Sequence, residues 1–133
     1  MTPEERDTFL QETRIGKLAT LNADGSPTMV PIWFEWDGAE ARIFTSRKSP
    51  KVARIRRDPR VALSVEEGVG VPERWVTIEG LATIDETGGM ELARRLAARY
   101  YSPARCAQAL ADWEKMSDQW VVLRITPRKL LGG

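Results

Sequence analysis

The sequence predicts a mainly-β, α+β protein, a small antiparallel barrel of six strands with flanking helices. Two Asp-Gly turn signals, Asp24-Gly25 and Asp37-Gly38, separate short apolar runs, which is typical of an antiparallel meander. Helix signals follow the third run, and a helical pair precedes the last one. The 133 residues suit one domain, spanning 1–133, that can bury a core.

The first elements follow from capping and turn chemistry. Thr2 is expected to cap a helix, with Pro3 in its first position and Glu5 completing a capping box, and this helix ends between residues 13 and 16. Strands are expected over residues 17–21, 28–36 and 41–45.

Pro31 lies inside the second expected strand. Proline cannot donate to a strand ladder, so this position is an edge, a bulge or a place where another group approaches the backbone. Val30, Ile32 and Trp33 beside it offer apolar surface that suits one side of a flat heteroaromatic ring. A plain barrel-edge proline is the alternative interpretation.

The stretch from Ile43 to Arg54 reads as a strand end, a loop and a helix start. Ser49 is a suitable N-cap and Pro50 suits the first helical turn, while Asp58-Pro59 closes the helix. Free amide groups and the helix dipole favour an anion at this end. The hydroxyls and cations gathered there predict a phosphate site, with a solvated basic turn as the alternative. They are Thr45, Ser46, Arg47, Lys48, Lys51 and Arg54.

The rest of the chain completes the expected barrel. Strands are expected over residues 61–65 and 74–84, with Gly80 marking a bend, and helices over 90–101 and 103–116. The last strand is expected over residues 119–126, stopped by Pro127, and the final Leu-Leu-Gly-Gly is expected to fray.

The composition excludes several classes of function. Formal net charge is +1, which gives no overall electrostatic case for nucleic acid; a nucleic-acid-binding barrel using Arg54, Arg56, Arg57 and Arg60 is a poor alternative. The chain has no histidine and one cysteine, Cys106, so we expect no metal site and no His-based catalysis. Without an apolar run of membrane-spanning length or a signal peptide, we expect a soluble cytoplasmic protein with no membrane partner.

The order of these elements, with their residues, resembles the pyridoxamine-phosphate-oxidase-like split β-barrel flavoproteins, in particular the branch of small F420-dependent oxidoreductases. The resemblance covers residues 9–84 best. The segments that carry it are Arg14 to Leu21, Asp24 to Pro27, Val30 to Phe34, Thr45-Ser46, Lys51 to Leu63 and Val76 to Ala82.

The resemblance implies a split barrel that forms a homodimer, with the cofactor at the subunit interface. It places the cofactor phosphate on Thr45, Ser46, Lys51 and, less directly, Arg54. The ring system falls along Val30, Pro31 and Ile32. Trp75 and Val76 are expected to reach the site from the other subunit.

The chemistry that the resemblance implies is hydride transfer between reduced deazaflavin F420 and an unsaturated small-molecule acceptor. The alternatives are an FMN-dependent oxidoreductase of the same fold, or a carrier of flavin, F420 or haem without turnover. No catalytic residue is assigned, because the sequence offers no clear proton donor. Vitamin B6 oxidation is not expected, since that activity needs a histidine near the C-terminus, and this chain has none.

Overall fold

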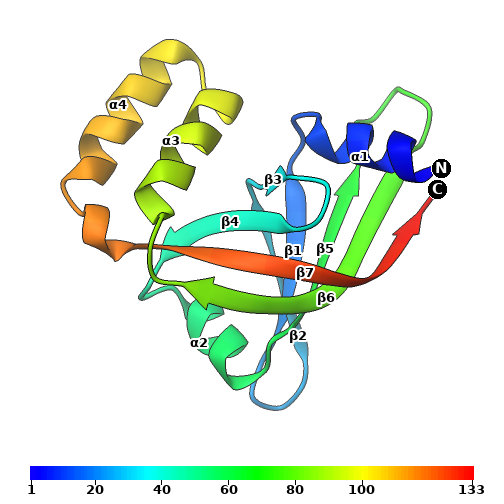
Figure 1. The fold of residues 1–133 in the computed structure, drawn as a ribbon, viewed down its shortest axis with the longest axis horizontal. Coiled ribbons are helices and arrows are strands. Elements are labelled where there is room, and N and C mark those ends of the chain that lie inside the picture. Colours follow the sequence, from blue (N-terminus) through cyan, green and yellow to red (C-terminus); the bar gives the residue numbers. More distant parts are fainter.

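The computed structural model describes residues 1–133 and contains one seven-stranded antiparallel sheet that curls into a half-barrel (Figure 1). The strand order in the sheet is β2-β1-β5-β6-β7-β4-β3. In chain order the elements are α1 (Pro3–Gln11), β1 (Gly16–Leu21), β2 (Pro27–Ile32), β3 (Glu35–Trp36), β4 (Ala41–Ser46), α2 (Pro50–Arg57), β5 (Arg60–Glu66), β6 (Trp75–Asp85), α3 (Gly89–Tyr100), α4 (Pro103–Glu114), η1 (Ser117–Gln119) and β7 (Trp120–Gly132).

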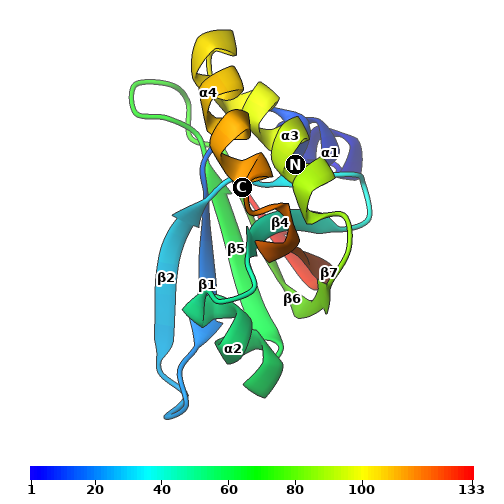
Figure 2. The same cartoon turned by 90° about the vertical axis from the view of Figure 1, so that its left-hand side faces the viewer.

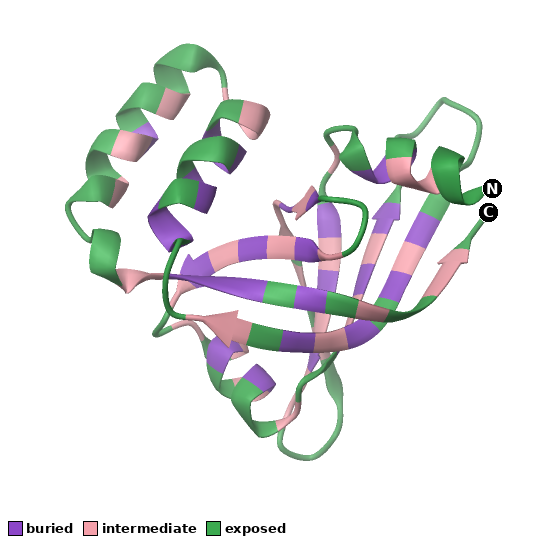
Figure 3. Ribbon diagram, in the orientation of Figure 1, coloured by how far each residue is buried: buried purple, intermediate pink, exposed green.

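The hairpin turns and the N-terminal cap of α1 form where the sequence predicts them. Gly25 and Gly38 in the two Asp-Gly turns have φ of +86° and +94°, the left-handed conformation that glycine adopts without strain. The Thr2 side chain accepts a hydrogen bond from the backbone of Glu5, as expected for the cap of α1. Buried and half-buried residues alternate along the strands, so one face of the sheet is turned to the core (Figure 3).

The second expected strand is two strands in the structure, which raises the number from six to seven. The chain leaves β2 after Ile32, and the fully buried Phe34 turns into the core before the short β3 begins. As a result β2 and β3 are the two edges of the sheet, and backbone hydrogen bonds do not close the barrel. This is the split barrel that the family resemblance implies.

The last strand does not stop at Pro127, and the C-terminus does not fray. β7 continues to Gly132 because a register shift between Glu79 and Gly80 places Gly80 opposite Pro127 and accommodates the missing N–H group. A Cβ atom on Gly80 would lie 2.1 Å from the carbonyl oxygen of Thr126, so only glycine fits this close approach. Backbone hydrogen bonds of 3.1 and 3.2 Å between Gly133 and Trp75 hold the end of the chain.

Two apolar clusters hold the helices on the sheet. The barrel core buries Phe9 and Leu10 of α1 and Val52 and Ile55 of α2. A second cluster under the α3–α4 hairpin is built on Leu92 and Leu96, which share one face of α3, and on Val122 of β7. The hairpin projects from one end of the sheet (Figure 1), and no helix of this chain has the length and apolarity to span a bilayer.

Candidate cofactor site

A pocket of about 220 Å³ lies at the seam between β2 and β4, where two strand edges face each other. β2 pairs only with β1, and β4 beyond Arg42 pairs only with β7, so both strands present free backbone groups to this seam. Figure 2 shows β2 at the edge of the sheet, with α2 near the β1–β2 end. The lining residues are Pro31, Ile32, Trp33, Ile43, Phe44 and Lys51.

Two cations of α2 stand beside this pocket without a carboxylate partner. The ammonium of Lys51 donates to the hydroxyl oxygens of Thr45 (3.2 Å) and Ser49 (3.1 Å), and the guanidinium of Arg54 donates to the hydroxyl oxygen of Thr20 (2.7 Å). By contrast, Arg47 and Arg56, at either side of them in the chain, both form ion pairs with Glu86. The structure therefore leaves two positive charges at the seam uncompensated.

Burial and a neighbouring cation both disfavour the charged form of Lys51. Partial burial lowers the pKa of Lys51 from its ordinary 10.5, and the positive charge of Arg54 lowers it further. An anion near these two side chains would raise the pKa of Lys51 and so oppose the effects of burial and of Arg54, because it would stabilise the charged form of Lys51. Two cations on successive turns of α2, with the hydroxyls of Thr45 and Ser49 beside Lys51, fit the phosphate group of a flavin or deazaflavin cofactor.

The structure brings together part of the predicted phosphate set. Thr45 is bonded to Lys51, and Arg54 lies one helical turn further along α2. The Ser46 hydroxyl accepts a hydrogen bond from the backbone of Lys48 (3.2 Å), so it shapes the turn that leads into α2. Ser49 precedes α2 as expected, but its hydroxyl accepts from Lys51 and makes no capping hydrogen bond.

Arg47 and Lys48 differ from the rest of the basic stretch. The guanidinium of Arg47 forms an ion pair with Glu86 and donates two hydrogen bonds, of 2.7 and 3.0 Å, to the carbonyl oxygen of Asp118. It therefore links the loop after β4 to the turn before β7. The side chain of Lys48 is exposed. Only part of the predicted basic cluster is therefore available to an anion at the seam.

The residues predicted for the ring system lie along β2. Pro31 and Ile32 line the seam pocket, while the half-buried Val30 lies opposite Leu18 of β1 and is not among its lining residues. Trp75 and Val76 begin β6 beside the C-terminus (Figure 1), and neither lines the pocket in the same chain. Trp75 is 41% exposed, whereas the side chain of Val76 is fully buried in the barrel core.

Several residues at the site are not in the predicted set. Ile43 and Phe44 line the pocket, and Thr20 is the partner of Arg54 although it lies 34 positions earlier in the chain. A hydroxyl on an ordinary strand carries no local signal of such a contact. The place of Phe44 could have been inferred, since it directly precedes Thr45 in the same strand.

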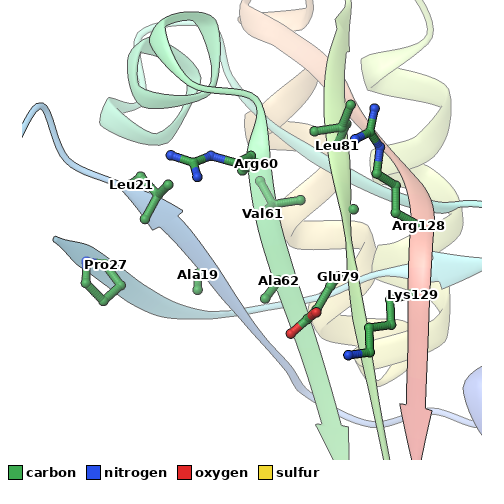
Figure 4. Close-up of a pocket in the computed structure, with 11 residues that line it drawn as sticks. Ala19, Leu21, Pro27, Arg60, Val61, Ala62, Glu79, Leu81, Arg128 and Lys129 are labelled. Atoms are coloured by element: carbon green, nitrogen blue, oxygen red, sulfur yellow. The ribbon is translucent and has the colours of Figure 1, made fainter. Parts of the chain in front are cut away.

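A second hollow, of about 470 Å³, lies on the outer face of the sheet and contains none of the predicted site residues. Small and apolar side chains form its floor, with charged side chains around them (Figure 4). The apolar residues are Ala19, Leu21, Pro27, Val61, Ala62 and Leu81, and the charged ones are Arg60, Glu79, Arg128 and Lys129.

The curled sheet, the open seam and the uncompensated cations together define a split β-barrel protein with a site for an anionic cofactor. A sequence profile described as pyridoxamine 5'-phosphate oxidase matches residues 2–132, and the chain belongs to this family.

Two characterised relatives align with most of the chain. An F420H(2)-dependent biliverdin reductase from Mycobacterium tuberculosis (strain CDC 1551 / Oshkosh) is 36% identical over 101 residues, which is 71% of this chain and 69% of the relative. A 5a,11a-dehydrotetracycline/5a,11a-dehydrooxytetracycline reductase from Streptomyces rimosus is 37% identical over 91 residues, or 63% of this chain and 64% of the relative.

Solved structures share the fold over nearly the whole chain. A conserved hypothetical protein from Mycobacterium tuberculosis superposes with a TM-score of 0.78 at 31% identity, covering 99% of this chain and 84% of the other. A protein described as an F420 reductase superposes with a TM-score of 0.75 at 26% identity, covering 94% of each chain.

Proposed function

We propose that this protein is an F420-dependent oxidoreductase that transfers a hydride from reduced F420 to an unsaturated small-molecule acceptor. The observation that carries the proposal is the pair of uncompensated cations, Lys51 and Arg54, at the open seam of the barrel. Both relatives described above are named reductases, and one of them is named for its dependence on F420H(2).

Two groups of residues at the seam would bind different parts of such a cofactor. Lys51, Arg54, Thr45 and Ser46 would hold its phosphate through charge-assisted and hydroxyl hydrogen bonds. The segment from Val30 to Ile32 would hold the ring system, because a strand edge offers both backbone amides and carbonyls to a heteroaromatic ring. When bound, reduced F420 supplies the hydride.

The chain's own contribution to the chemistry is to position the cofactor against an apolar wall. The residues that line the seam pocket are apolar except Lys51, and an apolar wall strengthens the electrostatic interactions made inside it. Lys51 is the one titratable side chain among them, and its ammonium would be committed to the phosphate. We therefore expect water, rather than a protein side chain, to supply the proton that completes reduction of the acceptor.

The outer face of the sheet supports a homodimer as part of this proposal. The 470 Å³ hollow has an apolar floor, with three basic side chains and the acidic Glu79 around it, so two copies of this face could pair opposite charges across a two-fold axis (Figure 4). In such a dimer Trp75, already 41% exposed, would be free to meet the partner's cofactor site. Sedimentation equilibrium of the purified protein tests this, and a monomer at micromolar concentration would contradict it.

Fluorescence titration of the purified protein with F420 and, separately, with FMN tests the proposed cofactor. We expect micromolar or tighter binding of F420 and weaker binding of FMN; the reverse preference would indicate a flavin enzyme or carrier. Lys51→Ala should weaken F420 binding by about 1.5–3 kcal/mol through loss of a charge-assisted hydrogen bond. Lys115→Ala, at an exposed lysine directly after α4, is the matched control and should change nothing.

Reduction of an acceptor separates the enzyme from a carrier. The protein with reduced F420 should reduce at least one of a panel of enones, quinones and biliverdin. The return of the absorbance of oxidised F420 measures this reaction. Tight binding of F420 without reduction of any acceptor would support the carrier instead.

A further inference from the structure

Six aromatic rings form a continuous array from the seam pocket to the α3–α4 hairpin. The Trp33 ring stacks on Tyr100 (centroids 5.0 Å apart, planes within 2°) and meets Tyr101 edge-on at 4.6 Å. Phe44 contacts Trp113 at 5.3 Å and Trp120 at 5.7 Å. The array is spread over four elements, the break between β2 and β3 that holds Trp33, and the turn after α3, so it forms only in the folded chain.

Two of these six rings, Trp33 and Phe44, line the seam pocket beside Lys51. Both are half-buried, with one part packed in the array and another part bordering the pocket. The array therefore ends in an apolar aromatic wall at the place where we propose that the cofactor binds.

Hydrogen bonds as well as stacking fix the position of the Trp33 ring. The hydroxyl of Tyr100 donates to the carbonyl oxygen of Arg14 (2.6 Å) and accepts from the backbone N–H of Phe34 (3.4 Å). The hydroxyl thus holds the break between β2 and β3, which consists of Trp33 and Phe34, and it limits movement of both residues. A ring held in this way loses little conformational entropy when a ligand stacks on it.

We propose that Trp33 and Phe44 form the binding wall for the hydride acceptor, and that the acceptor is a flat conjugated carbonyl compound of at least two fused rings. This inference rests on the proposed function. The two rings are tilted by 56° with centroids 6.5 Å apart, so a flat π-system can stack on the Trp33 ring and meet Phe44 at an angle, whereas a small puckered ring gains far less stacking and buried area. Trp33 is then a specificity-determining residue and Tyr100 is a positioning residue that acts through it.

The variants separate the wall from simple packing. Trp33→Leu removes an aromatic ring that lines the pocket, and Trp33→Phe restores a smaller one. Trp120→Leu is the matched control, because Trp120 belongs to the same array, lines no part of the seam pocket and has no ring contact with Trp33. Tyr100→Phe keeps the stacked ring and removes the hydrogen bonds of the hydroxyl.

The probes are menadione, a flat fused-ring quinone, and 2-cyclohexen-1-one, a small puckered enone. Calorimetry measures menadione binding to the protein saturated with oxidised F420, which donates no hydride, and to the protein without cofactor. Steady-state kinetics with reduced F420 give KM and kcat for both acceptors, and a fluorescence titration gives the Kd of F420 for every variant.

We expect Trp33→Leu to raise the Kd of menadione about tenfold while kcat/KM for cyclohexenone and the Kd of F420 change less than about threefold. Trp33→Phe should recover part of the menadione affinity, and Trp120→Leu should leave it unchanged. Tyr100→Phe should raise KM for menadione with little change in kcat, a split that general loss of stability would not produce.

Three results would overturn the inference: unchanged menadione affinity in Trp33→Leu, equal losses for both acceptors, or an equal loss of F420 affinity that makes Trp33 part of the cofactor site. If wild-type protein binds no F420, the proposed function fails by itself. The menadione titrations without cofactor then still decide whether Trp33 forms a binding wall.

Discussion

Replacing Lys51 with methionine should leave the protein without cofactor as stable as before or more stable, while it weakens cofactor binding. Methionine keeps most of the apolar length of the side chain and removes a charge that folding places, partly buried, beside Arg54. The hydrogen bonds lost are two, to the hydroxyls of Thr45 and Ser49, which remain free to turn to other partners. The lost charge and the lost hydrogen bonds therefore act in opposite directions on stability, but in the same direction on binding.

The size of the effect follows from ligand linkage. F420 at 100 times its Kd stabilises the wild-type protein by about 2.7 kcal/mol. A loss of about 2 kcal/mol in binding raises Kd roughly 30-fold, so the same concentration stabilises the variant by only about 0.9 kcal/mol. For a chain of this length 1 kcal/mol corresponds to about 3.6 °C, so F420 should raise Tm by about 10 °C in the wild type and about 3 °C in the variant.

Differential scanning fluorimetry with and without F420 measures both parts of this prediction, with Lys115→Met as the control on an exposed lysine. Equal increases in Tm for the wild type and Lys51→Met would refute the placement of the phosphate. A fall of more than about 4 °C without ligand would refute the argument that the charge of Lys51 destabilises the protein in the absence of cofactor.

Three further predictions concern the frame and the charges around the site. Gly80→Ala places a Cβ atom 2.1 Å from the Thr126 carbonyl oxygen and should lower the free energy of unfolding by about 2–3 kcal/mol in urea denaturation, whereas Gly68→Ala, with open space around it, should not. Arg14 and Arg74 hold the pKa of Glu67 at about 2, below its ordinary 4.5, so this carboxylate stabilises the fold above about pH 4.5 and the contribution is lost as the pH falls toward 2. Glu67→Gln should therefore differ from the wild type in urea denaturation at neutral pH and converge with it in acid, while Glu73→Gln should match the wild type throughout. Because a bound phosphate favours charged Lys51, the affinity for F420 should fall as the pH rises through the lowered pKa of Lys51, as measured by fluorescence titration.

Each of these predictions has an outcome that contradicts it. Equal stability of Gly80→Ala and Gly68→Ala would mean that β7 moves away from the added methyl group at no cost. A constant difference between Glu67→Gln and the wild type from pH 7 to pH 2 would remove the ion pairs as its cause. An F420 affinity that is independent of pH in the wild type and in Lys51→Met would separate Lys51 from the phosphate.

The sequence predicts those elements whose signals are local. The Asp-Gly turns, the Thr2 cap and the start of α2 at Pro50 depend on residues within a few positions of each other, and all three form as expected. The stripe of Leu92 and Leu96 is also local, since helical spacing alone places both on one face.

The features that local patterns missed depend on residues far apart in the chain. Pro127 reads as the end of a strand, but Gly80, on another strand, accommodates it in a bulge. Trp33 and Phe34 read as the middle of a strand, but the Tyr100 hydroxyl, 66 positions away from Phe34, bonds to the backbone at the break. At the site, Arg47, Lys48, Lys51 and Arg54 were predicted together, and no local pattern shows that Arg47 is paired with Glu86, 39 positions away.

Glu86 reduces the positive charge around the site, because it forms ion pairs with two of the neighbouring arginines. The segment from Arg47 to Arg57 carries six cations, enough to attract a polyanion. Glu86 neutralises Arg47 and Arg56, which lie on either side of Lys51 and Arg54 in the chain. Four cations of this segment keep no carboxylate partner: Lys51 and Arg54 near the seam, and Lys48 and Arg57. A protein without Glu86 would keep the pocket but add Arg47 and Arg56 to this positive surface, and we expect it to attract nucleic acids and other polyanions more strongly than the native protein does.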